Sequence, residues 1–252
     1  MISRIKKSWD SVKCFNSPHS SASSPRQPTS PSGFTLLELL IVVSIIAILS
    51  VALVLVLDPA EALRKSRDSQ RMSDLSTMKT ALGIYLTSTT TPLLGGASNA
   101  GCKLTATGAY AAGDLIYYSG VAGFSDLLLD GSVTSGQPTA QISSTPATTD
   151  GLGWIPVPFD NLIGGSPISN LPVDPVNTIA SASNVVSTDL VYRYACSITP
   201  LAFEIDAQLE SAAYATTGSA DNKKTTDGGN ADLYYEVGTN LKILGTGASV
   251  PF

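Results

Sequence analysis

The sequence predicts an α+β protein in which one long N-terminal helix packs on a small antiparallel sheet. Three observations support this fold class. An uncharged apolar run extends from Leu39 to Leu57, an amphipathic pattern continues it to Leu86, and two segments between Leu190 and Leu209 alternate in polarity. The apolar run has the length of a membrane-spanning helix, and the amphipathic pattern has the period of a helix. Alternation with a period of two is typical of a half-buried strand.

The apolar run is long enough to cross a membrane. It contains 19 residues without a charge. A helix from Phe34 to Leu57 would be about 36 Å long, against a hydrocarbon core of about 30 Å. Its serine hydroxyls can bond to carbonyls of the same helix. Glu38 is unusual, because an ionised side chain costs about 2.5 to 3.5 kcal/mol at the bilayer centre and less near the edge. We therefore expect a spanning helix whose one acid has a specific role.

The amphipathic continuation begins with a helix start signal at residues 58–61. Asp58 can cap, Pro59 suits the first helical position, and Glu61 completes a capping box. The expected core positions, three or four residues apart or at sums of these spacings, are Leu63, Met72, Leu75, Met78, Leu82 and Tyr85. We expect one helix of about 50 residues that is kinked or loosened near Asp58.

The alternating segments predict an antiparallel hairpin. Residues on one face are Leu190, Tyr192, Tyr194, Cys196 and Ile198, then Leu201, Phe203, Ile205, Ala207 and Leu209. Thr199-Pro200 joins the two strands, and Arg193 is expected to face Asp206 or Glu204 across the pair. Elsewhere, Phe124–Leu129 is expected to form a short helix. Leu233–Val237 and Leu241–Leu244 should add a strand or a terminal tail.

A family resemblance rests on the residues that begin the apolar run. Gly33 followed by Phe34-Thr35-Leu36-Leu37-Glu38-Leu39-Leu40 resembles the processing signal of type IV pilins and of type II secretion pseudopilins. The resemblance implies that a prepilin peptidase cuts after Gly33 and methylates Phe34. It also implies that Glu38 pairs with the new amine of Phe34 on a neighbouring subunit and sets filament register. The alternative is a glutamate that extends to the membrane interface and has no such role.

The resemblance also implies a division of the chain and a pilin-like fold. Residues 1–33 would be a cytoplasmic leader that is removed, and 34–57 the membrane and filament-core helix. Residues 58–90 would be its amphipathic half. The head would be residues 91–252, with a variable region at 92–187 and the antiparallel sheet at 188–244.

The charge distribution predicts the orientation in the membrane. Residues 1–33 carry five basic residues and one acidic residue, whereas the remainder carries ten and nineteen. Positive charge beside a span stays cytoplasmic, so the head is expected outside, first on a single-pass membrane protein and then on an extracellular or periplasmic filament. The acidic remainder also argues against nucleic acid as a partner.

Removal of the leader would change the cysteine and histidine counts. Cys14 and His19 would be lost, which leaves Cys102, Cys196 and no histidine. We expect a disulfide between the two cysteines in an oxidising compartment, the alternative being two separately buried thiols. Without histidine, Ser-His-Asp and Cys-His catalysis and the usual histidine-bearing zinc sites are excluded. We do not expect an enzyme.

An oxygen-rich loop near the C-terminus contains Asp221, Asp227 and Asp232. Major pseudopilins bind calcium in such a region, so the resemblance suggests these carboxylates as calcium ligands. An ordinary tight turn at Asp227-Gly228-Gly229-Asn230 is the other interpretation, and no other cofactor is expected.

Taken together, these features favour a prepilin, the structural subunit of a type IV pilus-like filament. Its expected partners are membrane lipid before assembly, the prepilin peptidase, a membrane assembly platform, and further copies of itself in the filament. The alternatives are a pseudopilin of a type II secretion system and a minor pilin that acts as an adhesin or DNA-uptake receptor. A plain single-pass protein or enzyme would instead stay full length.

Overall fold

The computed structural model describes residues 33–120, 125–126, 145–180 and 184–245. The chain divides into two compact units, residues 1–53 and 54–252, and each is described by itself. Apart from Gly33, the expected leader lies outside the described residues.

Two helices follow one another along the chain, α1 (Leu36–Leu57) and α2 (Pro59–Ser88). Asp58 separates them with a left-handed backbone at φ 37° and ψ 75°, and its Oδ1 accepts the N–H of Glu61 at 3.3 Å. The helix start signal at Asp58 is therefore confirmed. A residue at positive φ cannot continue a right-handed helix, so the expected loosening takes the form of a complete break at one residue.

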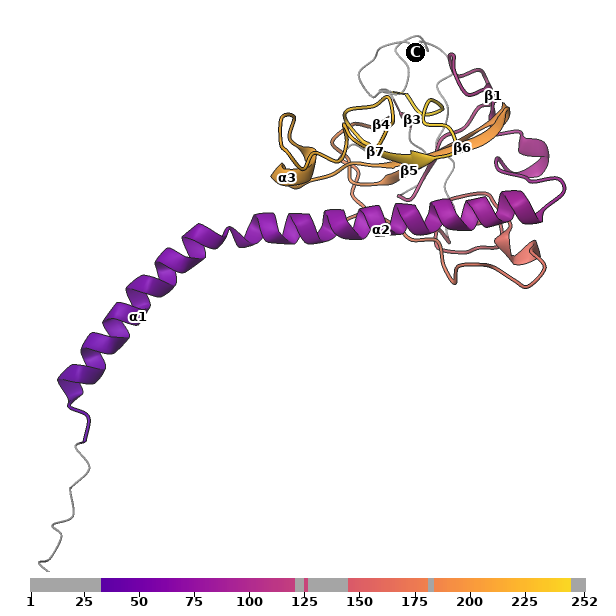
Figure 1. Ribbon diagram of the computed structural model, residues 1–252. Coiled ribbons are helices and arrows are strands. Elements are labelled where there is room, and N and C mark those ends of the chain that lie inside the picture. The colour runs from indigo at the N-terminus through magenta and orange to yellow at the C-terminus, as the bar shows by residue number, and fades with distance from the viewer. Residues whose placement is uncertain (1–32, 121–124, 127–144, 181–183, 246–252) are drawn as a thin grey trace, which may run out of the picture. The chain divides into compact units, whose positions relative to one another are not determined.

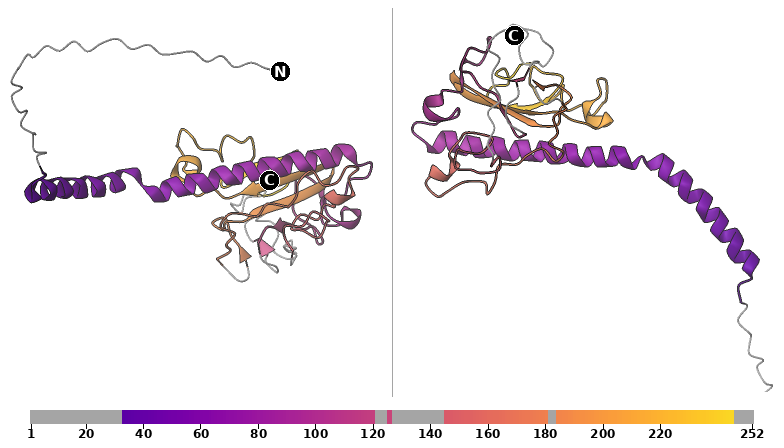
Figure 2. Two further views of the ribbon diagram at one scale, coloured as in Figure 1. Left: turned by 90° about the horizontal axis from the view of Figure 1, so that it is seen from below. Right: turned by 180° about the vertical axis from the view of Figure 1, so that it is seen from behind.

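The second helix lies along one face of the sheet (Figures 1 and 2). Leu75, Met78, Leu82 and Tyr85 are buried there as expected, whereas Leu63 is exposed. The spacing of three and four residues places the four buried side chains on one stripe of the helix. The stripe continues toward the helix N-terminus with two charged residues, Asp68 and Arg71, which are also buried.

The main sheet has the strand order β1-β5-β6-β7, and β2 also pairs with β5. The strands are β1 (Lys103–Thr105), β2 (Tyr117–Tyr118), β5 (Tyr192–Thr199), β6 (Leu201–Ala207) and β7 (Tyr235–Gly238). The hairpin of β5 and β6 is confirmed, with Arg193 opposite Asp206. The sheet is mixed and not purely antiparallel, because β1 runs parallel to β5. The long connection between these strands allows the crossover that parallel pairing requires.

Both faces of this sheet are covered. Toward α2, the side chains of Tyr192, Tyr194 and Phe203 join the helix in the larger core. On the opposite face, a second core contains Ala195, Ala202, Ile243 and Leu244 among other residues. The alternation in polarity suggests that the polar positions of the hairpin face solvent, but in the structure these positions are covered. Arg193 is 2% exposed, and Glu204 and Asp206 are fully buried.

The remaining elements are short. Strands β3 (Ser125–Asp126) and β4 (Asn184–Val185) form a second, parallel sheet. The helix expected at Phe124–Leu129 is thus wrong for the two residues of that segment that the structure describes. Short helices are η1 (Ala97–Asn99), η2 (Phe159–Asn161) and α3 (Ala212–Ala215). A disulfide joins Cys102 to Cys196, beside the pairing of β1 with β5.

Candidate functional site

The segment before α1 is exposed and has no regular structure. Gly33, Phe34 and Thr35 precede the helix, and the Phe34 side chain is 82% exposed. Nothing lies within 4 Å of the position that a Cβ would take at Gly33. An exposed, non-helical peptide bond is the form in which a chain can enter the active site of a protease. The bond between Gly33 and Phe34 is therefore accessible to cleavage.

Thr35 and Glu38 form a capping box at the start of α1. The Thr35 hydroxyl accepts the N–H of Glu38 at 3.2 Å, and the Thr35 carbonyl accepts that of Leu39 at 3.2 Å. In return, Glu38 Oε2 accepts the N–H of Thr35 at 3.2 Å and its hydroxyl at 3.0 Å. This arrangement satisfies N–H groups that a helix start otherwise leaves free, and it fixes the carboxylate beside the residue that precedes the helix.

This capping role of Glu38 was not predicted from the sequence. The signal was present in Thr35-Leu36-Leu37-Glu38, because a threonine followed three residues later by a glutamate is the pattern of a capping box. Glu38 thus has hydrogen-bond partners within its own chain before any second subunit is considered.

Helix α1 presents apolar side chains on all sides. Residues 36–54 form the one helix, among the described residues, that is long and apolar enough to cross a membrane. Every side chain described in α1 is exposed. Ser44 and Ser50 donate their hydroxyls to the carbonyls of Ile41 and Ile46, both at 2.7 Å, as expected. The helix therefore offers a partner or a lipid tail an apolar surface whose hydroxyl donors are already satisfied.

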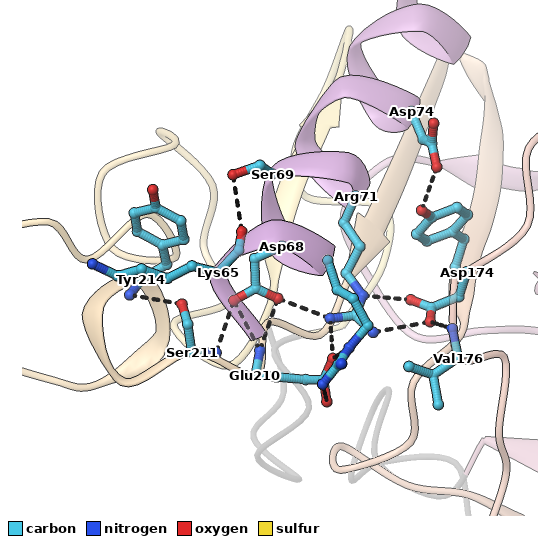
Figure 3. Close-up of polar contacts among 12 residues, drawn as sticks. Lys65, Asp68, Ser69, Arg71, Asp74, Asp174, Val176, Glu210, Ser211 and Tyr214 are labelled. Carbon is cyan, nitrogen blue, oxygen red and sulfur yellow. Dashed lines mark hydrogen bonds and ion pairs between the residues drawn. The ribbon is translucent and has the colours of Figure 1, made fainter. Parts of the chain in front are cut away.

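A buried ionic cluster attaches α2 to the rest of its unit (Figure 3). Arg71 binds Asp174 through two bonds, Nε to Oδ2 at 2.6 Å and Nη2 to Oδ1 at 2.9 Å. Its Nη1 also donates to Asp68 at 2.8 Å and to Glu210 at 2.7 Å. Arg67 adds a further pair of bonds to Glu210. The guanidinium of Arg71 thus joins the helix to the loop around Asp174 and to the chain that follows β6.

The carboxylates of the cluster are also bound by backbone N–H groups. Asp68 accepts those of Glu210 and Ser211, and Asp174 accepts that of Val176 at 2.8 Å. Burial by itself lowers the pKa of Arg71, but its hydrogen bonds to the three carboxylates raise that pKa overall. The hydrogen bond from Arg67 lowers the pKa of Glu210. These shifts favour the charged forms of Arg71 and Glu210, and the bonds of the cluster hold the helix against the rest of its unit.

The structure does not gather the three aspartates expected to bind calcium. Within the described parts of the chain, no three Asp, Glu, His or Cys side chains lie close enough to hold a metal ion. Asp227 instead accepts the N–H of Gly229 at 2.9 Å and of Glu236 at 2.7 Å. Asp221 and Asp232 are exposed. The geometry at Asp227 is that of a closed turn.

Comparison with protein families finds the prokaryotic N-terminal methylation motif at residues 30–54. No curated protein and no solved structure matches the chain. The motif covers the segment around Gly33 and Phe34, the capping box and α1 as far as Val54. An α+β unit with a helix packed on a mixed sheet follows this apolar helix, as the resemblance implied. The chain therefore carries, at residues 30–54, the prepilin-type N-terminal methylation motif that pilins and pseudopilins share.

Proposed function

We propose that the chain is a prepilin that is cut after Gly33, methylated on Phe34 and assembled as the structural subunit of a type IV pilus-like filament. The observation that carries this proposal is the placement of an exposed Gly33–Phe34 bond directly before a capped apolar helix whose described side chains are all classed as exposed. A peptidase needs the first feature and a filament core needs the second. The role is structural and not enzymatic.

The proposed assembly step moves α1 from lipid into contact with the same helix of other subunits. Its leucine, isoleucine and valine side chains lose nothing by this exchange, because both environments are apolar. The acid at Glu38 gives the step its specificity. A carboxylate that loses water is stable only beside a cation, and cleavage creates one at the α-amino group of Phe34.

The capping box is compatible with this role. Its hydrogen bonds hold the Glu38 carboxylate against Thr35, the residue next to the Phe34 amine that cleavage would create. A neighbouring subunit that offers its own Phe34 amine would meet a carboxylate in a fixed orientation. The same bonds also reduce the cost of placing Glu38 near the membrane before assembly.

The processing step is tested by the mass of the mature chain. The full chain is produced together with a prepilin peptidase, and the N-terminus is read by mass spectrometry. We expect a product that begins with N-methylated Phe34, and a chain with Gly33 replaced by valine should remain uncut. A chain that keeps Met1 in the presence of active peptidase would overturn the proposal.

The assembly step is tested with Glu38→Leu, and Ser50→Ala serves as the matched control. Both changes remove a polar group from α1, but only the first removes a charge. We expect Glu38→Leu to be processed normally and to yield few or no surface fibres, whereas Ser50→Ala assembles as the wild type does. Normal fibres from Glu38→Leu would refute the proposed role of the carboxylate. If fibres are absent from wild-type cells and deletion blocks protein export, the subunit is a pseudopilin.

A further inference from the structure

Two buried glutamates lie on the sheet face that points away from α2. Glu204 on β6 is fully buried, and Glu236 on β7 is 2% exposed. The register pairs Asp206 with Glu236 and Glu204 with Gly238, so the two glutamates are diagonal neighbours on one face. A Cβ at position 229 would overlap the Glu236 carboxyl group, which shows how closely the loop before β7 covers it. Both carboxyl groups are therefore covered by protein.

One oxygen of each carboxyl group has clear donors. Glu204 Oε2 accepts the N–H groups of Ile243 at 2.6 Å and Leu244 at 2.8 Å. Glu236 Oε2 accepts the N–H of Ala231 at 2.9 Å. In the part of the chain that the structure describes, the buried Oε1 atoms of both residues receive no hydrogen bond from another group. Diagonal positions on neighbouring strands bring two long side chains within reach of one another, and here both side chains are buried. Two buried carboxyl groups with no donor for their Oε1 atoms can satisfy each other only if one of them carries a proton.

The surrounding charges favour Glu204 as the protonated partner. Burial, then the bond with Glu236, raises the pKa of Glu204 far above its ordinary value, and Asp206 adds to the effect. Burial raises the pKa of Glu236 to about 7, although the bond with Glu204 lowers it. The Asp227 carboxylate accepts the backbone N–H of Glu236, and its negative charge further raises the pKa of the Glu236 side chain.

The basic groups on this face have carboxylate or carbonyl partners. Arg193 on β5 binds both oxygens of Asp206 and stacks on the ring of Tyr234 at 3.6 Å. Lys103 on β1 donates to the carbonyls of Gly108 and Ile243 at 2.7 and 3.2 Å. The hydroxyl of Tyr110 also donates to the Ile243 carbonyl, at 2.9 Å.

We propose that Glu204 is a carboxylic acid that donates its hydrogen to Glu236, and that this bond is a pH-sensitive lock on the segment Ile243–Leu244. The lock closes three elements together. Its proton joins β6 to β7, while the other oxygen of Glu204 holds the backbone of the C-terminal segment. When a solvent base takes the proton, two carboxylates face each other without water, and the segment separates from the sheet.

The direction of the pH effect follows from linkage. In the unfolded or opened protein, Glu204 is ionised above about pH 4.5, whereas in the closed protein it keeps its proton. The closed form therefore binds more protons, and its stability falls as pH rises from that value toward the pKa of the closed form. For one proton, the opening constant increases by up to about tenfold per pH unit.

The test compares the wild-type chain with Glu204→Gln in detergent. The glutamine amide can donate permanently to Glu236, and its oxygen can still accept the two backbone N–H groups. Amide hydrogen exchange at Ile243 and Leu244 is measured from about pH 5 to about pH 9. The wild-type rate is divided by the variant rate, because this ratio removes the intrinsic pH dependence of amide exchange, which both proteins share. We expect this ratio to rise by up to about tenfold per pH unit. Asp160→Asn, which removes an exposed carboxylate elsewhere, should behave as the wild type.

A second measurement on the wild type covers the case in which the variant fails to fold. Near pH 8 ordinary carboxyl groups are ionised, so the infrared carbonyl stretch of a carboxylic acid should come from Glu204 alone. We expect this band in the wild type near pH 8. At higher pH the band should disappear, and exchange at Ile243 and Leu244 should increase together with its loss. A ratio that stays constant across the pH range, or a wild type without the band near pH 8, would overturn the proposal.

Discussion

Replacing Arg71 with methionine should strongly destabilise the unit that contains α2. Methionine fills a similar volume but leaves the buried Asp68 and Asp174 without the guanidinium that binds both of them. Removing one partner of a buried ion pair costs about 3 to 5 kcal/mol. Asp174 keeps the N–H groups of Val176 and Asn177, at 2.8 and 3.1 Å. We therefore expect the lower end of the range, about 3 kcal/mol, equivalent to about 6 to 12 °C in Tm for a unit of this size.

The assay is equilibrium unfolding of the full chain in detergent, followed by the near-UV signal of Trp154. This side chain is fully buried, and its indole donates to the Pro172 carbonyl at 2.8 Å, two residues from Asp174. Arg64→Met is the matched control. Arg64 is an exposed arginine of the same helix that approaches Glu61 only at 3.8 Å, and its loss should cost less than about 0.5 kcal/mol.

A double variant separates the ionic contribution from packing. In Arg71→Met with Asp174→Asn, the second change removes one uncompensated charge but keeps an oxygen for the backbone donors. The cost of the double variant should be smaller than the sum of the single costs by about 1 to 2 kcal/mol. If Arg71→Met costs no more than Arg64→Met, or if the two changes are additive, the cluster does not fix the helix as described.

Three further predictions concern other parts of the chain. Cys102→Ser should reduce the unfolding free energy by about 4 to 5 kcal/mol on the chain-entropy model, because the bridge to Cys196 spans 94 residues; an equal stability of the variant and the oxidised wild type would contradict this. The bond from Arg67 lowers the pKa of Glu210, so its contribution is complete above about pH 4.5 and is lost as pH falls through the lowered pKa. Glu210→Gln should therefore show a shallower acid unfolding curve than the wild type, and parallel curves would exclude the effect. Thr35→Val should lower amide protection at the first turn of α1 by about 1 kcal/mol, whereas Thr35→Ser should retain it; equal protection in the two variants would show that the hydroxyl does not cap the helix.

The sequence alone predicted the features that depend on neighbouring residues. The apolar helix, the start signal at Asp58 and the cleavage motif each occupy one continuous segment, and their physical causes act within a few residues. The hairpin of β5 and β6 was predictable for the same reason, since its strands are joined by a short turn and alternate with a period of two. The Thr35–Glu38 capping box belongs to this group, although we recognised it only in the structure.

Only the tertiary structure decided which polar residues are buried and what they bind. Arg71 lies 103 residues before Asp174, and Glu204 lies 39 residues before Ile243, so no local pattern links either pair. The period of two correctly placed Glu204 and Asp206 on the face away from α2, but it could not show that a second core and the C-terminal segment cover that face. Burial depends on the packing of segments distant in the sequence, and it is burial that turns these acids into a buried ion pair and a shared proton.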